Sequence, residues 1–132
     1  MTEAEANICR SLLDTLLFLA SESAQREFAK KRHYASYQGE FACWWFDTFF
    51  PEEPSTLQMF TGNELVILRA FSESFDGTLT AIGMAPLSIE ELLAKPEWKT
   101  MVAMASETCV QLSIAAQPGG RPRSLRSLDA AR

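Results

Sequence analysis

Hydrophobic residues recur at helical spacing near the start of the chain. In residues 4–20 the apolar positions lie three or four residues apart, at Ile8, Leu12, Leu16 and Leu19. This spacing is typical of an amphipathic helix with one buried face, so we expect a helix that ends near Ser21.

A second, more polar helix is expected directly afterwards. Ser23 has the residue type of an N-cap, and the helix would run to Arg32 or Tyr34. Ala24 and Phe28 form its inward side, and most of its other positions are polar or charged. We therefore predict that this helix lies outside the core.

The densest apolar stretch follows Gly39, which we interpret as a break in the helical pattern. Six aromatic residues fall within ten positions: Phe41, Trp44, Trp45, Phe46, Phe49 and Phe50. Each ring buries about 150–250 Å², whereas the largest apolar patch of a soluble monomer is about 300–600 Å². Most of these rings must therefore face a core or a partner. Because apolar residues occupy both faces, we predict a central helix that others enclose, ended by Pro51 and followed by a loop over 51–59.

Two further helices are indicated by capping boxes. Thr61 and Glu64 have the required spacing, and apolar positions continue to Leu79, although Asp76-Gly77 could end the helix early. Val66 and Ile67 leave a strand over 64–69 as the alternative. Ser88 and Glu91 form the second box and open a short helix to residue 94.

The last predicted helix begins at Pro96, a residue suited to a first turn. Its buried stripe is Trp98, Met101, Val102, Ala105, Cys109 and Leu112. After residue 116 the composition changes to Gly, Pro, Ser and Arg, which offer little to bury, so we predict a disordered basic tail over 117–132. Residues 1–116 are then one all-α domain, an irregular bundle of about five helices around the central aromatic helix. The alternative is an α+β fold with a small sheet.

Charge is distributed unevenly. Residues 1–116 hold 16 acidic and 8 basic side chains, whereas residues 117–132 hold four arginines and one aspartate. Five of the basic or potentially basic groups of the body cluster at Arg26, Lys30, Lys31, Arg32 and His33. Nucleic-acid binding depends on Lys and Arg at phosphates, so an acidic body disfavours it and favours a basic protein partner.

The three cysteines, at positions 9, 43 and 109, are far apart and odd in number. They indicate reduced thiols rather than a disulfide framework or a zinc site. The first residues are acidic and lack the basic region of a signal peptide, and the longest apolar run is too short for a membrane span. We therefore expect a cytoplasmic protein with no membrane contact.

Catalytic signatures are scarce. The only histidine, His33, lies in a basic polar stretch, and the sequence has neither a phosphate-binding loop nor a metal-binding motif. We expect no enzyme activity, no cofactor and no metal, although a carboxylate site built from Asp14, Glu40 or Asp47 leaves no spacing signature and stays open. Asp47 lies between aromatic residues, and we interpret it as a helix-end residue that holds the Pro51 turn. If it is buried, it needs a partner such as Arg69, Tyr37 or exposed backbone N–H groups.

One run resembles a family of small helical bacterial proteins. The likeness rests on Trp45-Phe46-Asp47, Phe49-Phe50-Pro51, Glu64-Leu65, Phe71, Phe75 and Pro96-Glu97-Trp98. In that pattern an aromatic-Trp-Phe-Asp-Asp-Leu-Tyr-x-Pro run precedes an amphipathic helix and an Asp-Pro-x-Trp helix start. This chain departs from it at Thr48, at Phe49-Phe50 and at Lys95. In size and charge the protein is also similar to immunity proteins that neutralise bacterial toxins.

The function predicted from these observations is non-enzymatic protein binding, in its specific form the neutralisation of a basic toxin domain. The partner-binding candidates are Glu52, Glu53, Glu64 and Glu73. Asp47, Trp44 and Trp45 are candidates for either a structural or a partner-binding role. The alternative is a small helical adaptor or a structural domain that works as a homodimer.

Overall fold

The computed structural model describes residues 2–115, which form seven helices and no strand. In chain order these are α1 (Glu3–Leu19), α2 (Glu22–Lys31), α3 (Tyr37–Phe46), α4 (Pro54–Met59), α5 (Gly62–Ile82), α6 (Ile89–Ala94) and α7 (Pro96–Ala115). The all-α prediction is confirmed. The alternative strand over 64–69 is wrong, because these residues lie in α5. The predicted tail over 117–132 and the boundary at residue 116 lie outside the described residues.

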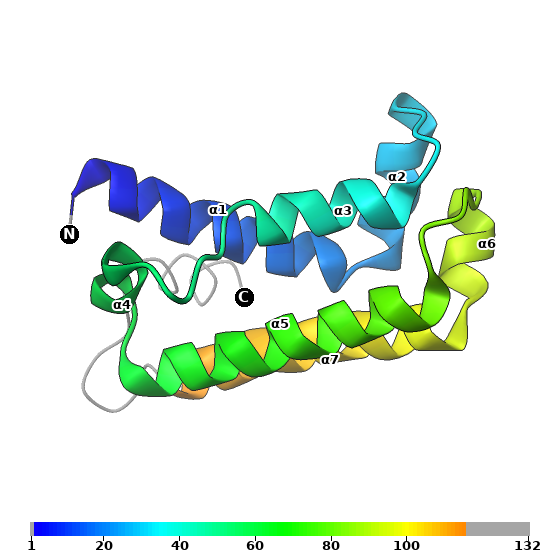
Figure 1. Ribbon diagram of the computed structural model, residues 1–132. Helices are drawn as coiled ribbons and strands as arrows, with labels where there is room; N and C mark the ends of the chain where they lie inside the picture. Colours follow the sequence, from blue (N-terminus) through cyan, green and yellow to red (C-terminus); the bar gives the residue numbers. More distant parts are fainter. Residues whose placement is uncertain (1, 116–132) are drawn as a thin grey trace.

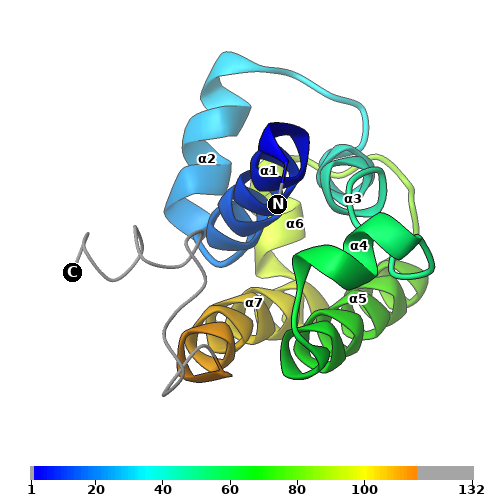
Figure 2. The same ribbon diagram turned by 90° about the vertical axis from the view of Figure 1, so that its left-hand side faces the viewer.

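The helices form two layers (Figure 1). α5 and α7 run side by side below, and α1 and α3 lie above them. The end-on view separates α1 and α3 from the α5–α7 pair and shows α4 beside the start of α5 (Figure 2). α2 packs against α1 and α6, so that α2 and α6 close one end of the bundle. None of the described helices has the length and apolarity that a bilayer crossing requires.

The aromatic helix α3 has the central position that the sequence predicts. Phe41 and Trp45 have no exposed surface, and the Trp45 ring lies 5.0 Å from Phe71 and 5.3 Å from Phe49 between centroids. Phe46 stacks on Phe75 of α5 at 5.5 Å. These ring contacts hold the upper layer against the lower one.

The start of α3 differs from the prediction. Ser36 caps the helix by accepting the Gly39 N–H at 3.1 Å, so Gly39 lies inside the helix instead of breaking it. A Cβ at Gly39 would come within 3.0 Å of the Ser36 Oγ and 3.1 Å of the Met84 Cε. The glycine therefore serves a close approach to its neighbours, a role that looks the same as a helix break in the sequence.

The predictions for α2 were wrong in two respects. Ser21, not Ser23, is the N-cap, and its hydroxyl accepts the Ala24 N–H at 3.0 Å. The buried side of α2 consists of Gln25 and Ala29, and Ala29 belongs to the core. α2 is thus part of the packed bundle, and it contributes a polar residue, Gln25, that is fully buried there.

The predicted loop over 51–59 is also wrong in its second half, where Pro54 opens α4 and Thr56 is buried. α5 passes through Asp76-Gly77 without ending there and stops at Gly83, which adopts φ +81°. The remaining helix starts are confirmed. Both capping boxes are closed in the structure, α7 begins at Pro96, and its predicted stripe is buried except for the half-buried Val102.

Candidate functional site

Asp14, Glu40 and Asp47 are the carboxylates that could build a catalytic site, and His33 is the only histidine of the sequence. Within the described residues, no group of three or more His, Cys, Asp or Glu side chains could hold a metal ion. His33 is exposed after the end of α2. Asp14 is exposed on α1, whereas Glu40 is half-buried on α3. The absence of enzyme activity stays a prediction.

Asp47 is exposed and is the C-cap residue of α3, where its N–H donates to the Cys43 carbonyl at 2.9 Å. The two side chains considered as partners of a buried Asp47 bond to other groups. The Tyr37 hydroxyl donates to the Arg32 carbonyl at 3.0 Å, and the Arg69 guanidinium donates to the Pro51 carbonyl at 3.2 Å. Because α3 ends at Phe46, the chain turns outward there and the carboxylate needs no compensating charge.

The two adjacent tryptophans have different surroundings. Trp45 is fully buried, and its indole N–H donates to the Ser72 hydroxyl at 3.1 Å. Trp44 is half-buried and lies 5.0 Å from both Phe18 and Phe28 between ring centroids. Trp45 is therefore a core residue, and only Trp44 keeps surface available for another molecule.

Glu64 is placed differently from the other three predicted contact residues. Its side chain is 3% exposed and accepts the Thr61 N–H at 2.8 Å, while the Thr61 hydroxyl accepts the Glu64 N–H. Glu64 therefore holds the start of α5 and offers almost no surface to a partner.

Burial, and secondarily the negative charges of Glu64 and Glu5, raises the pKa of the Cys9 thiol to about 11.

Glu52, Glu53 and Glu73 are exposed, and one contact links their two segments. Arg69 on α5 donates to the Pro51 carbonyl just before Glu52, which brings the α3–α4 connection against α5. Along α5, Val66, Arg69, Glu73 and Asp76 are spaced by three, four and three residues, so they share one face of the helix. All four are exposed. We name the surface around this contact the acidic face: Asp47, Phe50, Glu52, Glu53, Val66, Arg69, Glu73 and Asp76.

Two large apolar side chains lie within the acidic face. Phe50 is 49% exposed and Val66 is 67% exposed, the latter the most exposed large apolar residue of the described chain. From the sequence, the aromatic run was expected to be mainly core, and neither residue was expected to be a contact. A signal existed for each: Phe50 follows the end of a helix and precedes a proline, and Val66 falls outside the buried Leu68, Phe71 and Phe75 stripe.

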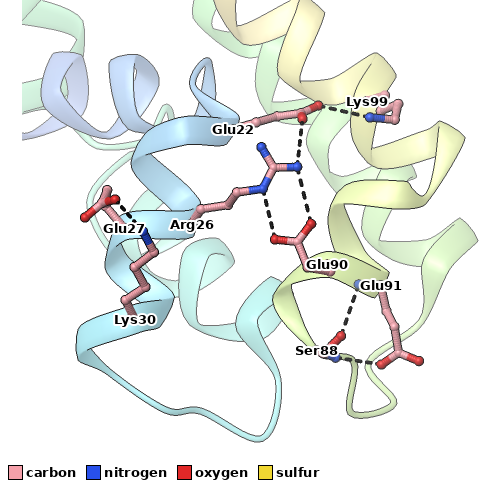
Figure 3. Close-up of polar contacts among 8 residues, drawn as sticks. All are labelled: Glu22, Arg26, Glu27, Lys30, Ser88, Glu90, Glu91 and Lys99. Carbon is pink, nitrogen blue, oxygen red and sulfur yellow. Dashed lines mark hydrogen bonds and ion pairs between the residues drawn. The ribbon is translucent and has the colours of Figure 1, made fainter.

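The carboxylates of the acidic face have no ion-pair partner among the described residues. All the ion pairs found there lie around α2, at Arg26–Glu22, Arg26–Glu90, Lys30–Glu27 and Lys99–Glu22. Figure 3 shows Arg26 between the carboxylates of Glu22 and Glu90. The bond to Glu90 raises the pKa of Arg26, and the bond to Lys30 lowers the pKa of Glu27. Arg26, Lys30 and Lys99 thus pair with acids around α2, whereas the acidic face has one cation, Arg69, and no ion pair among the described residues.

No protein-family model matches the chain, and no curated protein or solved structure matches it either. The resemblance to small helical bacterial proteins and to immunity proteins therefore stays a prediction.

Proposed function

We propose that the protein binds a partner protein that carries a basic surface, and that it does so through the acidic face. The observation that supports this is the joint exposure of Phe50 and Val66 among unpaired carboxylates around the Arg69–Pro51 contact. Protein interfaces commonly combine apolar or aromatic anchors with a polar rim. Glu52, Glu53 and Glu73 would form that rim.

Charge supports a basic partner. The acidic face contains five carboxylates and a single cation, Arg69, which is occupied by a carbonyl. Complementary charges raise the rate of encounter and disfavour partners of the same sign. An acidic partner or a nucleic acid would meet repulsion at this surface, whereas a surface rich in Lys and Arg would gain attraction.

The neutralisation of a toxin is the specific form of this proposal. A toxin domain that acts on nucleic acid needs a basic surface to hold phosphates, and an acidic protein can occupy that surface. The adaptor or homodimer alternative relies on the same exposed Phe50 and Val66 but needs no basic partner. A basic partner is therefore the feature that separates the two.

Cys43 offers a way to identify the partner. It is the exposed cysteine and lies on α3 one turn before Asp47, whereas Cys9 and Cys109 are buried. A photo-crosslinker attached to Cys43 would capture a protein seated on the acidic face. The captured protein is then purified, and its affinity for the unmodified protein is measured by titration calorimetry.

The decisive comparison uses two charge-reversal variants with the same change in net charge. Glu52→Lys with Glu73→Lys alters the acidic face, and Glu97→Lys with Glu107→Lys alters exposed acids of α7. We expect the first pair to weaken binding of the captured protein at least tenfold and the second pair to leave it within about twofold. Equal effects of the two pairs, or a captured protein without a basic surface, would contradict the proposal. Thermal melts of both variants check that they fold.

A further inference from the structure

A groove of about 590 Å³ lies between α2 and α6, on a different part of the molecule from the acidic face. Its apolar walls are Ala29, Tyr34, Tyr37, Pro86, Leu87 and Ile89. Small-molecule sites usually have volumes of about 300–1,000 Å³, an apolar lining and a few polar groups that orient the ligand. The α2–α6 groove matches that description in both size and lining.

The charged groups of the groove are mainly cationic, although the body of the protein is acidic. Arg26, Lys30 and His33 line it together with one acid, Glu90. Arg26 and Glu90 bind each other at 2.9 Å, so that end of the groove is close to neutral (Figure 3). Lys30 is the remaining charged residue of the lining, and the imidazole of His33 lines the groove three residues further along the chain.

These two groups are available to a ligand. The imidazole of His33 makes no hydrogen bond or ion pair within the described residues and is exposed. Lys30 pairs with Glu27 at 2.9 Å on the surface of α2, and both side chains are more than half exposed. Exposed pairs of this kind are weak, so an anion in the groove can compete for the ammonium group.

The walls of the groove are held in place by contacts from outside it. A backbone bridge joins Ser36 to Leu87, and the Gln38 amide donates to the carbonyls of Gly83 and Ala85 at 3.1 and 2.9 Å. These contacts attach the α5–α6 connection to the start of α3. A site that is already formed needs little ordering when a ligand binds.

The aromatic wall is similarly fixed. The Tyr34 ring stacks on Phe28 with 5.8 Å between centroids and 7° between planes, and Tyr37 is anchored by its hydroxyl bond to Arg32. Tyr34 is 37% exposed, so one part of its ring remains open to a ligand. An aromatic or branched apolar group could pack against this surface.

We propose that the α2–α6 groove binds a small organic anion with an apolar body. The body packs between the two tyrosines and the Leu87 and Ile89 side of the groove. The anionic group accepts hydrogen bonds from the Lys30 ammonium and the His33 imidazole. This site is independent of the acidic face, so the two proposals can fail separately.

The test uses 8-anilinonaphthalene-1-sulfonate, an anion with an aromatic body whose fluorescence reports binding. We expect saturable 1:1 binding to the full chain. We further expect displacement by 3-phenylpropionate, and little displacement by 3-phenylpropylamine, which has the opposite charge, or by acetate, which lacks the apolar body. Absence of saturable binding, or equal displacement by the amine and the acid, would overturn the proposal.

Substitutions test whether the ligand binds in the groove. Lys30→Glu should weaken binding about tenfold, the effect of losing one charge-assisted hydrogen bond. Lys95→Glu makes the same charge change at an exposed residue that does not line the groove, and it should leave affinity within about twofold. Tyr34→Ala should also weaken binding, through the lost ring surface. Equal affinities of the two lysine variants contradict the site.

A second copy of the chain is the alternative occupant of the groove, and its binding can be measured separately. Sedimentation velocity over a range of concentrations shows whether two copies bind. If the probe is excluded as a dimer forms, and Lys30→Glu restores the monomer, the groove is an interface between copies and the small-molecule proposal is wrong. A monomer that binds the probe at every concentration supports it.

Discussion

Replacing Gln25 should destabilise the protein far more than its polar character suggests. The side chain is fully buried between α1, α2 and α7. Its amide oxygen accepts the Trp98 indole N–H at 2.9 Å, and its amide nitrogen donates to the Leu19 carbonyl at 3.1 Å. A longer contact of 3.4 Å reaches the Phe18 carbonyl. One amide thus joins the end of α1 to the first turn of α7.

The magnitude follows from the groups left unpaired. Gln25→Ala removes the partners of the Trp98 N–H and the Leu19 carbonyl, and each buried group without a partner costs about 1–3 kcal/mol. A water molecule that enters the vacated space could recover part of that cost. We therefore expect a loss of about 2–4 kcal/mol in the free energy of unfolding. Domains of this kind have about 5–15 kcal/mol in total.

The assay is urea unfolding followed by far-UV circular dichroism, with the midpoint and slope fitted together. Ser23→Ala, at an exposed position of the same helix, is the matched control and should stay within about 0.5 kcal/mol of the parent protein. A loss below about 0.5 kcal/mol for Gln25→Ala would refute the reasoning, because it would mean that these hydrogen bonds do not hold α2 in place.

A second substitution at position 25 should make the stability of the protein depend on pH. Gln25→Glu keeps the shape but directs a carboxyl group at the Leu19 and Phe18 carbonyls, so burial should raise the folded-state pKa of the new side chain. Below the unfolded-state pKa of about 4.3 the group is protonated in both states, and the variant should be close to the parent protein. Its stability relative to the parent should then fall as pH rises through the folded-state pKa. A difference that does not change between pH 4 and 8 would refute this.

Three further predictions concern the core, the thiols and the glycines. Trp45→Ala should cost about 3–5 kcal/mol in the same urea assay because the ring is fully buried, and a loss below about 1 kcal/mol would contradict that placement. Thiol labelling at pH 8, followed by mass spectrometry, should modify Cys43 rapidly, while the buried Cys9, with its pKa raised to about 11, should react only after denaturation. Gly77→Ala should stabilise α5 by about 0.5–1 kcal/mol, whereas Gly83→Ala should cost about 1–3 kcal/mol because of its φ of +81°; thermal melts that show the same sign for both would contradict the helix boundaries.

Local sequence signals predicted those helices whose ends and buried faces can be recognised from a few neighbouring residues. The capping boxes at Thr61 and Ser88 and the proline at position 96 each mark a helix start that the structure contains. The central aromatic helix was predicted from the area of its rings, which cannot all remain in water, and from the apolar residues on both of its faces. For these elements, propensity, capping and burial all favour the same structure.

The failures share a different cause. Gln25 is buried because of Trp98, a residue 73 positions away, so a polar residue on a polar helix gave no local sign of burial. α4 has six residues and one buried side chain, which is too short for a periodic apolar pattern. Gly39 occupies a close approach that depends on Met84. Contacts of this kind depend on tertiary packing and cannot be recognised in a short stretch of sequence.

The exposure of the candidate contact residues was only partly predictable from the sequence. Glu52, Glu53 and Glu73 are exposed, but Glu64 is buried in the capping box that the sequence had already indicated. A glutamate at the third position of a capping box bends back onto the backbone, so this signal could have removed it from the contact set. Asp47 was expected at the end of the aromatic helix, and the structure places it there as the C-cap residue of α3.

Association kinetics of the captured partner, measured over a range of ionic strengths, test the central claim most directly. Exposed charges are screened beyond about 8–10 Å near physiological salt. The association rate constant should therefore fall steeply as salt is added, and reversing Glu52, Glu53 and Glu73 together should slow association at low salt and flatten that dependence, with a smaller effect on dissociation. An association rate that is insensitive to salt, and unchanged by the three reversals, would contradict binding through the acidic face.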